Sequence, residues 1–544
     1  MEQKTSQVDK IKIKRALISV SDKSGIESLA KTLHAKGCEI ISTGGTKKVL
    51  ELAGIPVTEI SKVTGNPEAF GGRMKTISFQ IESALLFDRE KDADEAKSLG
   101  IESIDMVVCN LYPFERVKNQ GADFDTLIEN IDIGGPTMVR AAAKNFKYVA
   151  IVTNPRHYQD LVKELNENEG SLSYETRYKL MRSAFNATAD YDAMIATTMD
   201  ETAGELSVRL AYDRAIGLRY GENSHQSAFF LRSRKGSDSL YDMRVLHGKE
   251  LSFNNIVDMF SAIDSVRDLN GFGCAVIKHN NPCGLASGSE QRIVFEEAWA
   301  GDPVSAFGSV IAFNKKLTRE TVEFLNLDNE KKMLRKFVEV VIAPEFEQET
   351  LDYLFQNKNL RVVEFDPARL RPEQDLKFMY NAILVQNPDQ KLYEKQETAT
   401  DAEMEVGEEL LDFGMVAVRQ LKSNAIAIVR KLNNGDLQLL GMGCGQPNRV
   451  NSTQLAIKRS RENLELEFDG KPEKLESYIK KQMGNAVLVS DAFFPFPDNI
   501  ELAGEAGITK IFQPGGSIRD KSVIEKCNEL GIAMVFTGTR HFKH

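Results

Sequence analysis

Short apolar runs alternate with stretches of helical periodicity along the first 200 residues. The runs contain β-branched side chains, which is typical of buried strands. They cover residues 16–20, 38–42, 106–109 and 149–152. After the first run, apolar side chains recur every three or four positions, at Ile26, Leu29, Ala30 and Leu33. Strands that alternate with helices predict an α/β domain with a parallel sheet, and we expect this domain to close near residue 200.

Polar loops follow the first two predicted strands, at the positions where helices begin. They are Ser21–Gly25, which contains Lys23, and Thr43–Thr46. Hydroxyl groups, glycines and free backbone N–H groups at a helix start can hold a phosphate, although serine and threonine are also common helix caps. The carboxyl ends of neighbouring parallel strands lie at one edge of a sheet. Two such loops therefore strengthen the prediction of an anion site.

Three further segments add polar side chains to the same predicted edge, at residues 71–76, 110–114 and 131–137. The first joins two glycines to the cations Arg73 and Lys75. The last contains Asp132 and leads into a helix predicted over residues 138–144. A solvated basic loop and a helix-capping carboxylate are the structural alternatives for these segments.

The apolar run Cys274–Ile277 leads directly into Lys278 and His279. Pro282 and Gly284 disfavour a continuing strand, so we expect a buried strand that ends in a polar turn. An imidazole takes up a proton near neutral pH, and a neighbouring ammonium group donates a proton or holds an anion. The two side chains are therefore a candidate acid–base pair, and the alternative is a solvated lysine beside an ordinary loop histidine.

Two polar segments predict the boundaries of larger units. Glu201–Ser207 is polar, contains a glycine and is a plausible linker. Residues 394–409 are strongly acidic and weakly apolar, as expected of an exposed connector between two lobes. A chain of 544 residues is also expected to form about three or four compact units.

Composition narrows the class of protein. Apolar residues make up 42% of the chain and charged residues 27%, which is ordinary for a globular protein. Residues 1–15 lack the apolar segment of a signal peptide and no long apolar run occurs, so we expect a cytoplasmic protein without a membrane segment. The net charge of −10 disfavours nucleic-acid binding. The cysteines and histidines show no metal-ligand spacing, and we predict no metal site.

Taken together, these segments resemble the family of bifunctional purine-biosynthesis proteins that join AICAR transformylase to IMP cyclohydrolase. The most specific segments are SVSDK (19–23), TGGT (43–46), GGRMKT (71–76), RYGENSHQ (219–226), KHNNPCG (278–284), SDAFFPF (490–496) and the tail around Arg540. The resemblance spans nearly the whole chain. It implies a methylglyoxal-synthase-like α/β domain over residues 1–204 and two cytidine-deaminase-like lobes over residues 205–544.

The resemblance implies two consecutive reactions. A formyl group moves from the cosubstrate 10-formyltetrahydrofolate to the 5-amino group of AICAR, and the product FAICAR closes to IMP with loss of water. The amine is a poor nucleophile, so transfer needs a base for its proton and an acid for the departing folate nitrogen; His279 and Lys278 can fill those roles. Asn424 is the third implied catalytic residue. The residues implied to bind substrates are Arg219, Tyr220, Arg449, Phe493 and Arg540. Phe493 and Phe494 offer aromatic surface, and core packing is the alternative for both.

Ring closure needs an anchored phosphate and stabilised charge on the formyl oxygen. The resemblance implies catalytic roles for Lys75, Tyr112, Asp132 and Lys144. The residues implied to bind the nucleotide are Ser19, Ser21, Lys23, Thr43, Gly45, Thr46, Arg73, Thr76, Asn110 and Gly134.

Two segments depart from the family pattern. Ile77–Phe79 stands where the family usually has Leu-His-Pro, and Asn381–Ala382 stands where a glycine pair is common. Serine cannot titrate near neutrality, so Ser78 cannot supply a proton that a histidine would. Because the residues assigned to phosphate binding and charge stabilisation are present, we expect the cyclohydrolase to remain active.

The sequence leaves three alternative functions and the oligomeric state open. The first alternative is a transformylase with a non-catalytic nucleotide-binding domain. The others are elimination of phosphate from a triose phosphate by the first domain, and a nucleotide sensor without turnover. The resemblance also implies a homodimer whose transferase sites draw residues from both subunits.

Overall fold

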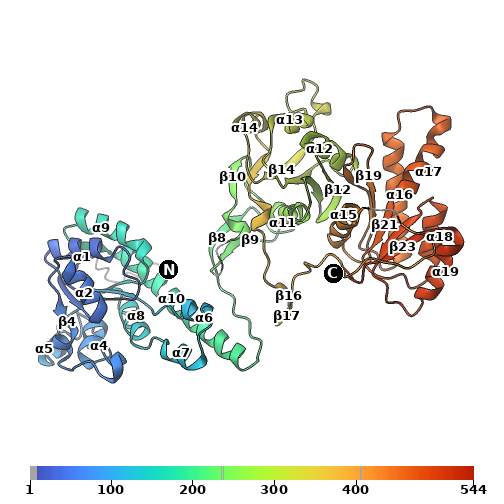
Figure 1. The fold of residues 1–544 in the computed structure, drawn as a ribbon. Coiled ribbons are helices and arrows are strands. Elements are labelled where there is room, and N and C mark those ends of the chain that lie inside the picture. Colours follow the sequence, from blue (N-terminus) through green and yellow to red (C-terminus); the bar gives the residue numbers. More distant parts are fainter. Residues whose placement is uncertain (1–8, 235, 237, 405–406) are drawn as a thin grey trace. The chain divides into compact units, whose positions relative to one another are not determined.

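Two compact units make up the chain (Figure 1). The computed structural model describes residues 9–544 with the exception of 235, 237, 405 and 406. The first unit extends to Ala211 and the second covers Tyr212–His544. The expected boundary between a cyclohydrolase domain (1–204) and a transformylase domain (205–544) stays a prediction. Within the described residues, no helix is long and apolar enough to cross a membrane.

A five-stranded parallel sheet forms the centre of the first unit, in the order β4-β3-β2-β5-β6. Its strands are β2 (Arg15–Val20), β3 (Glu39–Ser42), β4 (Thr58–Glu59), β5 (Met106–Asn110) and β6 (Ala150–Val152). Four of them match the predicted apolar runs to within one residue at either end, and the predicted α/β class is confirmed. β4 is too short to give a periodic signal in the sequence.

Helices pack around this sheet, with α1 against α9 and α8 against α4 and α10. The helices are α1 (Ile26–Ala35), α2 (Gly44–Leu52), α3 (Ile60–Thr64), α4 (Phe79–Leu86), α5 (Ala93–Ser98), α6 (Phe114–Asn119), α7 (Phe124–Glu129), α8 (Gly134–Lys144), α9 (Tyr158–Glu167) and α10 (Tyr174–Thr202). A two-stranded sheet pairs β1 (Lys10–Lys12) with β7 (Ser171–Ser173). One apolar cluster, from Ile11 to Ala184, joins the sheet to the helices.

The second unit contains one twelve-stranded sheet built from two halves of the same topology, in the order β10-β15-β14-β13-β11-β12-β20-β19-β21-β22-β23-β18. From the centre outward, each half has two antiparallel pairings, two parallel pairings and an antiparallel edge strand. The halves meet where Ala286 of β12 pairs with Gln438 of β20. We call them the first and second lobes. Their relation to cytidine deaminase stays a prediction.

The elements of each lobe follow one another in the same sequence. The first lobe contains β10 (Arg244–His247), α11 (Phe253–Arg267), β11 (Phe272–Lys278), β12 (Asn281–Gly288), α12 (Gln291–Ala300), β13 (Ser309–Phe313), α13 (Arg319–Val322), β14 (Val338–Ala343), α14 (Gln348–Leu354) and β15 (Arg361–Glu364). The second contains β18 (Glu397–Thr398), α15 (Glu408–Arg419), β19 (Ile426–Lys431), β20 (Leu437–Gly443), α16 (Arg449–Glu467), α17 (Leu475–Asn485), β21 (Val487–Ser490), α18 (Asp498–Glu505), β22 (Lys510–Gln513), α19 (Asp520–Leu530) and β23 (Ala533–Phe536). Two separate hairpins are β8 (Tyr212–Leu218) with β9 (Ala228–Ser233), and β16 (Asp375–Met379) with β17 (Ala382–Gln386).

Apolar side chains cover both faces of the large sheet. One cluster contains residues of α11 and α15 together with strands of both lobes, so the lobes share a core on this face. On the opposite face, α12 covers the first lobe and α16 to α19 cover the second. Within β11, Ala275 and Ile277 face α11 while Cys274 and Val276 face α12, as the alternation of a strand requires.

The strand that precedes Lys278 ends in a polar turn, as expected, but the expectation that Pro282 and Gly284 prevent a further strand was wrong. β12 resumes at Asn281 after a two-residue turn and continues through Pro282 and Gly284. Pro282 pairs with Ile277 at a shift in register. Such an irregularity accommodates a residue without a backbone N–H.

Residues 394–409 were expected to form an exposed connector between two lobes; most of the described ones are exposed, but they also contain secondary structure. They include β18, which pairs with β23 at the edge of the sheet, and the first residues of α15. Residues 405 and 406 lie outside the described residues. A strand of two exposed residues gives no apolar pattern in the sequence, so the prediction rested on the acidic composition alone.

Candidate active sites

A cavity of about 680 Å³ lies at the carboxyl ends of the parallel strands of the first unit. Its walls come from the loops after β2, β3 and β5, from residues 71–76 and from the N-terminal end of α8. Every residue predicted for the cyclohydrolase site lines this cavity, with the exception of Lys144. The structure therefore brings together side chains from five separate segments of sequence.

Lys23 and the N-terminus of α2 form a part of this cavity that suits a phosphate. The first N–H groups of a helix have no partner within the helix and favour anions. The Lys23 amino group lies 3.9 Å from the point where a Cβ on Gly45 would stand, so the glycine leaves open space beside the charge. The hydroxyl oxygens of Ser19 and Thr43 lie 3.3 Å apart at the same strand ends.

Two predicted nucleotide-binding side chains are hydrogen-bonded to the protein's own backbone. Asn110 accepts hydrogen bonds from the N–H groups of Ser21, at 2.6 Å, and Asp22, at 2.8 Å, and its amide donates to the Asp22 carbonyl. The Thr46 hydroxyl donates to the Val20 carbonyl at 3.0 Å. These contacts hold the loop after β2 in shape, and direct contacts of either residue with a nucleotide stay predictions.

Asp132 is a half-buried carboxylate at the turn before α8. One carboxylate oxygen accepts a hydrogen bond from the Gly135 N–H at 2.8 Å, and a Cβ on Gly135 would lie 2.4 Å from the other oxygen. The Asp132 N–H donates to the Tyr191 hydroxyl at 2.9 Å. Burial raises the pKa of Asp132, and the N–H groups of Gly135 and Tyr112 partly oppose the rise. A raised pKa makes this carboxylate a better proton acceptor than an exposed one.

The cations of the 71–76 segment lie in the wall of the same cavity. Lys75 Nζ is 3.8 Å from the Glu68 carboxylate, and Arg73 binds Glu129 at 2.5 Å. Burial raises the pKa of the Tyr112 phenol, with a further rise from the Asp132 charge. The phenol therefore stays protonated and can donate a hydrogen bond at neutral pH.

Lys144 is not brought to the cavity. It is exposed at the C-terminal end of α8, whereas the cavity is lined by Gly134, Gly135 and Met138 from the other end. At 1.5 Å per residue the two ends of this helix are roughly 15 Å apart. A catalytic role for Lys144 stays a prediction that this geometry does not support.

In the second unit, Lys278 and His279 lie at the tip of the β11–β12 hairpin. Lys278 is the last residue of β11, and its amino group donates to the Phe307 carbonyl at 2.8 Å. His279 is exposed in the two-residue turn, and both turn residues have positive φ angles. The hairpin therefore presents the imidazole to solvent and holds the ammonium group against the loop before β13.

Asn424 and Arg449 form a second group of predicted site residues. The Arg449 guanidinium is buried, forms an ion pair with Asp491 and donates to the Asn424 side-chain oxygen at 2.7 Å. The Asn424 amide donates to the Gln446 carbonyl at 2.9 Å. Arg449 thus fixes the orientation of the Asn424 amide, and its predicted contact with substrate would come in addition to these internal bonds.

Both groups lie at neighbouring ends of the central strands of the large sheet. The Cys444 thiol, just after β20, donates to the side-chain oxygen of Asn281 at 3.1 Å. Gln446, two residues further on, accepts the bond from the Asn424 amide. The loop after β20 therefore contacts the hairpin tip through Cys444 and contacts Asn424 through Gln446.

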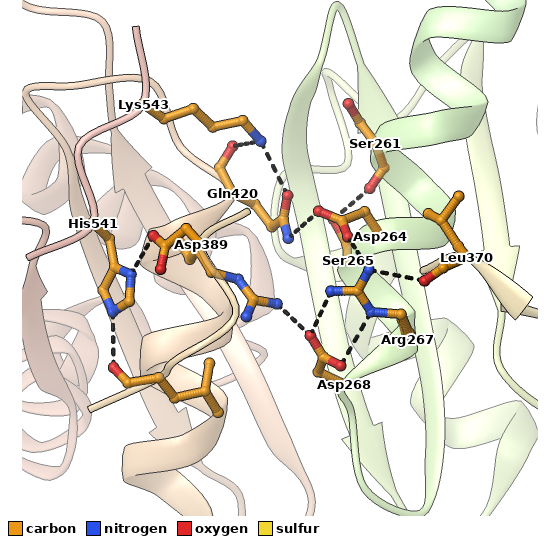
Figure 2. Close-up of polar contacts among 12 residues, drawn as sticks. Ser261, Asp264, Ser265, Arg267, Asp268, Leu370, Asp389, Gln420, His541 and Lys543 are labelled. Atoms are coloured by element: carbon orange, nitrogen blue, oxygen red, sulfur yellow. Dashed lines mark hydrogen bonds and ion pairs between the residues drawn. The ribbon is translucent and has the colours of Figure 1, made fainter. Parts of the chain in front are cut away.

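The C-terminal tail that carries Arg540 is anchored by a polar network between the lobes (Figure 2). The buried ring of His541 contacts the Asp389 carboxylate at 2.7 Å and the Leu392 carbonyl at 2.8 Å. The Lys543 amino group donates to the Gln420 side-chain oxygen at 3.2 Å, and burial lowers the pKa of Lys543. Arg540 itself is exposed and lies over the Phe542 ring.

The network continues into both helices of the shared core. Gln420 donates to Asp264 of α11 at 3.0 Å. Arg267 and Arg419 are the last residues of α11 and α15, and both form ion pairs with Asp268. The tail is therefore bonded to Gln420 directly and to the first lobe through Gln420, with Arg540 presented at the surface.

The remaining predicted residues separate into exposed and buried groups. Arg219 donates to the Tyr220 hydroxyl at 2.8 Å and lies over its ring, and within the described residues no hydrogen bond links this pair to the His279 hairpin. Phe493 is exposed, as a substrate contact requires, whereas Phe494 is fully buried in the core of the second lobe. The aromatic surface predicted for Phe494 is therefore corrected to core packing.

Sequence reasoning missed residues whose partners lie far along the chain. Asp258, Phe307 and Cys444 contact the hairpin, and Glu129 lines the first cavity beside Arg73. The hairpin could have been recognised from the Asn280–Asn281 pair, but no local pattern indicates which helix packs on it. Among the described residues, no group of three or more His, Cys, Asp or Glu side chains could hold a metal ion.

Two family models match consecutive parts of the chain. A family model described as the AICARFT/IMPCHase bienzyme matches residues 142–459, and a model of the MGS-like domain matches residues 25–137. A protein of Persephonella marina named bifunctional purine biosynthesis protein PurH is 42% identical, over 98% of this chain and 100% of the relative. A protein of the same name from Ruminiclostridium cellulolyticum is 40% identical over the same shares.

One solved structure, described as the crystal structure of ForH, is 34% identical and covers 36% of this chain and 100% of its own, with a TM-score of 0.32. The family model covers more than half of the chain, and both relatives cover nearly all of it. The chain therefore belongs to the AICARFT/IMPCHase bienzyme family and begins with an MGS-like domain.

Proposed function

We propose that the chain is a bifunctional enzyme of purine biosynthesis. It transfers a formyl group from 10-formyltetrahydrofolate to AICAR and closes the resulting FAICAR to IMP. The observation that carries this proposal is the similarity of the whole chain to proteins named for purine biosynthesis, with matches to both family models. The cavity of the first unit is the candidate site for ring closure, and the hairpin tip that carries Lys278 and His279 is the candidate site for formyl transfer.

For ring closure, we assign phosphate binding to Lys23 and the N-terminus of α2. The carboxamide nitrogen attacks the formyl carbon, loses a proton and forms a ring, after which water leaves. Asp132 accepts the proton, which its raised pKa favours, and Lys75 stabilises negative charge on the formyl oxygen. Tyr112 donates a hydrogen bond to the same oxygen.

For formyl transfer, the amine of AICAR attacks the formyl carbon of the folate. His279 accepts the proton from the amine, and Lys278 donates to the folate nitrogen as it departs. Asn424, oriented by Arg449, supports the imidazole or the substrate carboxamide. Arg219, Tyr220 and Arg540 supply exposed cationic and hydrogen-bonding groups for the nucleotide.

The test is conversion of AICAR and 10-formyltetrahydrofolate to IMP by the purified chain, followed by absorbance and by chromatography of the nucleotides. Formation of IMP supports both activities. Accumulation of FAICAR without IMP would leave a transformylase with a non-catalytic first domain. No FAICAR at all would contradict the proposal.

A homodimer is the assembly that we propose, because the hairpins of the second unit expose apolar side chains. Ile216 and Phe229 on β8–β9 and Phe378 and Leu384 on β16–β17 are all at least 49% exposed. Apolar surface of this kind is typical of protein interfaces. Sedimentation should give about twice the chain mass, and charged substitutions Phe229→Asp and Phe378→Asp should yield monomers. A monomeric wild-type chain would contradict the dimer.

The cytoplasmic location stays a prediction.

A further inference from the structure

The turn that carries His279 has a backbone conformation that is uncommon for residues other than glycine. His279 has φ +53° and Asn280 has φ +61°, so two consecutive non-glycine residues occupy the left-handed region. Turns of this type usually contain glycine, because a side chain is strained there. Lys278 and Asn281 pair directly across the hairpin, which leaves the two turn N–H groups without partners in the ladder.

A single carboxylate on the neighbouring helix binds both of these N–H groups. Asp258 of α11 accepts hydrogen bonds from the His279 N–H at 3.1 Å and from the Asn280 N–H at 2.8 Å, one on each oxygen. Ser261, one turn further along α11, donates to the Asn280 side-chain oxygen at 2.8 Å. Charge-assisted hydrogen bonds are the stronger kind, and two from one carboxylate also fix orientation.

The second lobe has the same topology but, among its described residues, lacks a carboxylate like that of Asp258. Counted back from the C-terminal arginines of the two helices, Leu410 of α15 takes the place of Asp258, and its side chain is buried in the shared core. The hairpin of that lobe turns through residues 432–436, which include Gly435 at φ +94°. The second lobe therefore closes its hairpin with a longer turn, and the carboxylate on the helix accompanies the short turn that carries His279.

We infer that Asp258 is a positioning residue for formyl transfer, which holds the strained turn so that His279 points at the substrate. This inference rests on the proposed function of His279 and deepens it. Loss of the carboxylate lets the turn relax to other conformations and moves the imidazole away from its working position. A displacement of about 1 Å can cost on the order of 100-fold in rate.

The first experiment compares formyl transfer by the full-length wild type and Asp258→Asn. We expect kcat to fall on the order of 10- to 100-fold while KM for AICAR changes by less than about threefold. Glu296→Gln, which removes a surface carboxylate from α12 of the same lobe, is the control for charge. An Asp258→Asn enzyme within about twofold of the wild-type kcat would overturn the inference.

Two double variants separate positioning from general stability. In Asp258→Asn with His279→Ala, kcat should equal that of His279→Ala alone, because a residue that acts through His279 adds nothing once the imidazole is gone. A further loss in this double variant would overturn the inference. Asn280→Gly should restore part of the kcat of Asp258→Asn, since glycine adopts a positive φ without strain. No recovery would count against the strained turn as the cause.

Hydrogen exchange provides a readout without turnover. In Asp258→Asn, the peptide that contains His279 and Asn280 should exchange at least about tenfold faster, while peptides from β11 upstream keep the wild-type rate. Unchanged exchange in the turn would overturn the inference. If wild-type protein transferred no formyl group, the proposed function would fail, and the exchange rates would still decide whether Asp258 holds the turn.

Discussion

Ser78 begins helix α4, and its hydroxyl oxygen accepts a hydrogen bond from the Ile81 N–H at 3.2 Å. This is the geometry of a helix N-cap, in which the side chain satisfies one of the free N–H groups of the first turn. Ser78 is not among the described residues that line the cavity of the first unit. The residue that departs from the family pattern therefore has a structural role of its own.

Ser78→Ala should destabilise the first unit by about 1 kcal/mol and leave kcat for FAICAR closure within about twofold. Ser78→Asp should recover the stability, because aspartate is also a good N-cap. Hydrogen exchange over α4 measures the stability, since the one tryptophan, Trp299, lies in the second unit. A large loss of kcat with normal exchange would instead place Ser78 in the chemistry.

Sequence patterns identified side chains better than they identified the partners of those side chains. Asn110 and Thr46 were correctly placed at the strand ends, but their hydrogen bonds to the loop after β2 depend on contacts across the sheet. Arg449 was recognised as a cation, whereas its burial against Asp491 comes from the contact of the first residue of α16 with the residue after β21. A partner distant in sequence leaves no local signal, and this limited prediction of the sites.

At the scale of elements, α12 of the first lobe meets the β19–β20 loop of the second. The Glu297 carboxylate accepts a hydrogen bond from Asn434 at 2.9 Å, and its other oxygen is buried with no hydrogen-bond partner among the described residues. Burial raises the pKa of Glu297 to about 7, and the nearby Asp436 charge contributes to the rise. The folded chain therefore binds a proton here more tightly than the unfolded chain.

This linkage gives a stability prediction with a definite sign. The contribution of Glu297 is greatest below its unfolded pKa of 4.5 and is lost as pH rises through about 7. Glu297→Gln should therefore shift the urea midpoint little at pH 5 and raise it clearly at pH 8, relative to wild type. Trp299 lies on the same helix, so its fluorescence reports unfolding of this lobe.

The comparison with Glu296→Gln, on the exposed side of α12, controls for the loss of one charge. A midpoint shift of equal size at both pH values would show that the Glu297 proton does not contribute to the lobe contact.

At the scale of the whole molecule, the parallel sheet of the first unit was predictable because its strands are buried on both faces and appear as apolar runs. The two lobes of the second unit were expected from the family resemblance alone, because their matching order of strands depends on pairing between distant segments. The path through Pro282 was missed for another reason: a shift in register against Ile277 tolerates the proline, and register depends on the partner strand. Local preference was overridden by pairing.

The two sites lie in units with separate apolar clusters, so the reactions should be separable by substitution. Lys75→Ala should accumulate FAICAR from AICAR because transfer continues while closure loses its cation. His279→Ala and Lys278→Ala should form no FAICAR, with losses on the order of 100-fold or more, and should still convert added FAICAR to IMP. Nucleotides separated by chromatography give both rates from one incubation.

Mixing the Lys75→Ala and His279→Ala chains should then restore IMP formation from AICAR. FAICAR released by the first variant can diffuse to the intact cyclohydrolase of the second, so IMP should appear after a lag that shortens as protein concentration rises. A mixture that accumulates FAICAR without IMP would show that the second site does not accept the intermediate from solution. Loss of both activities in either single variant would show instead that the two units do not act as independent catalysts.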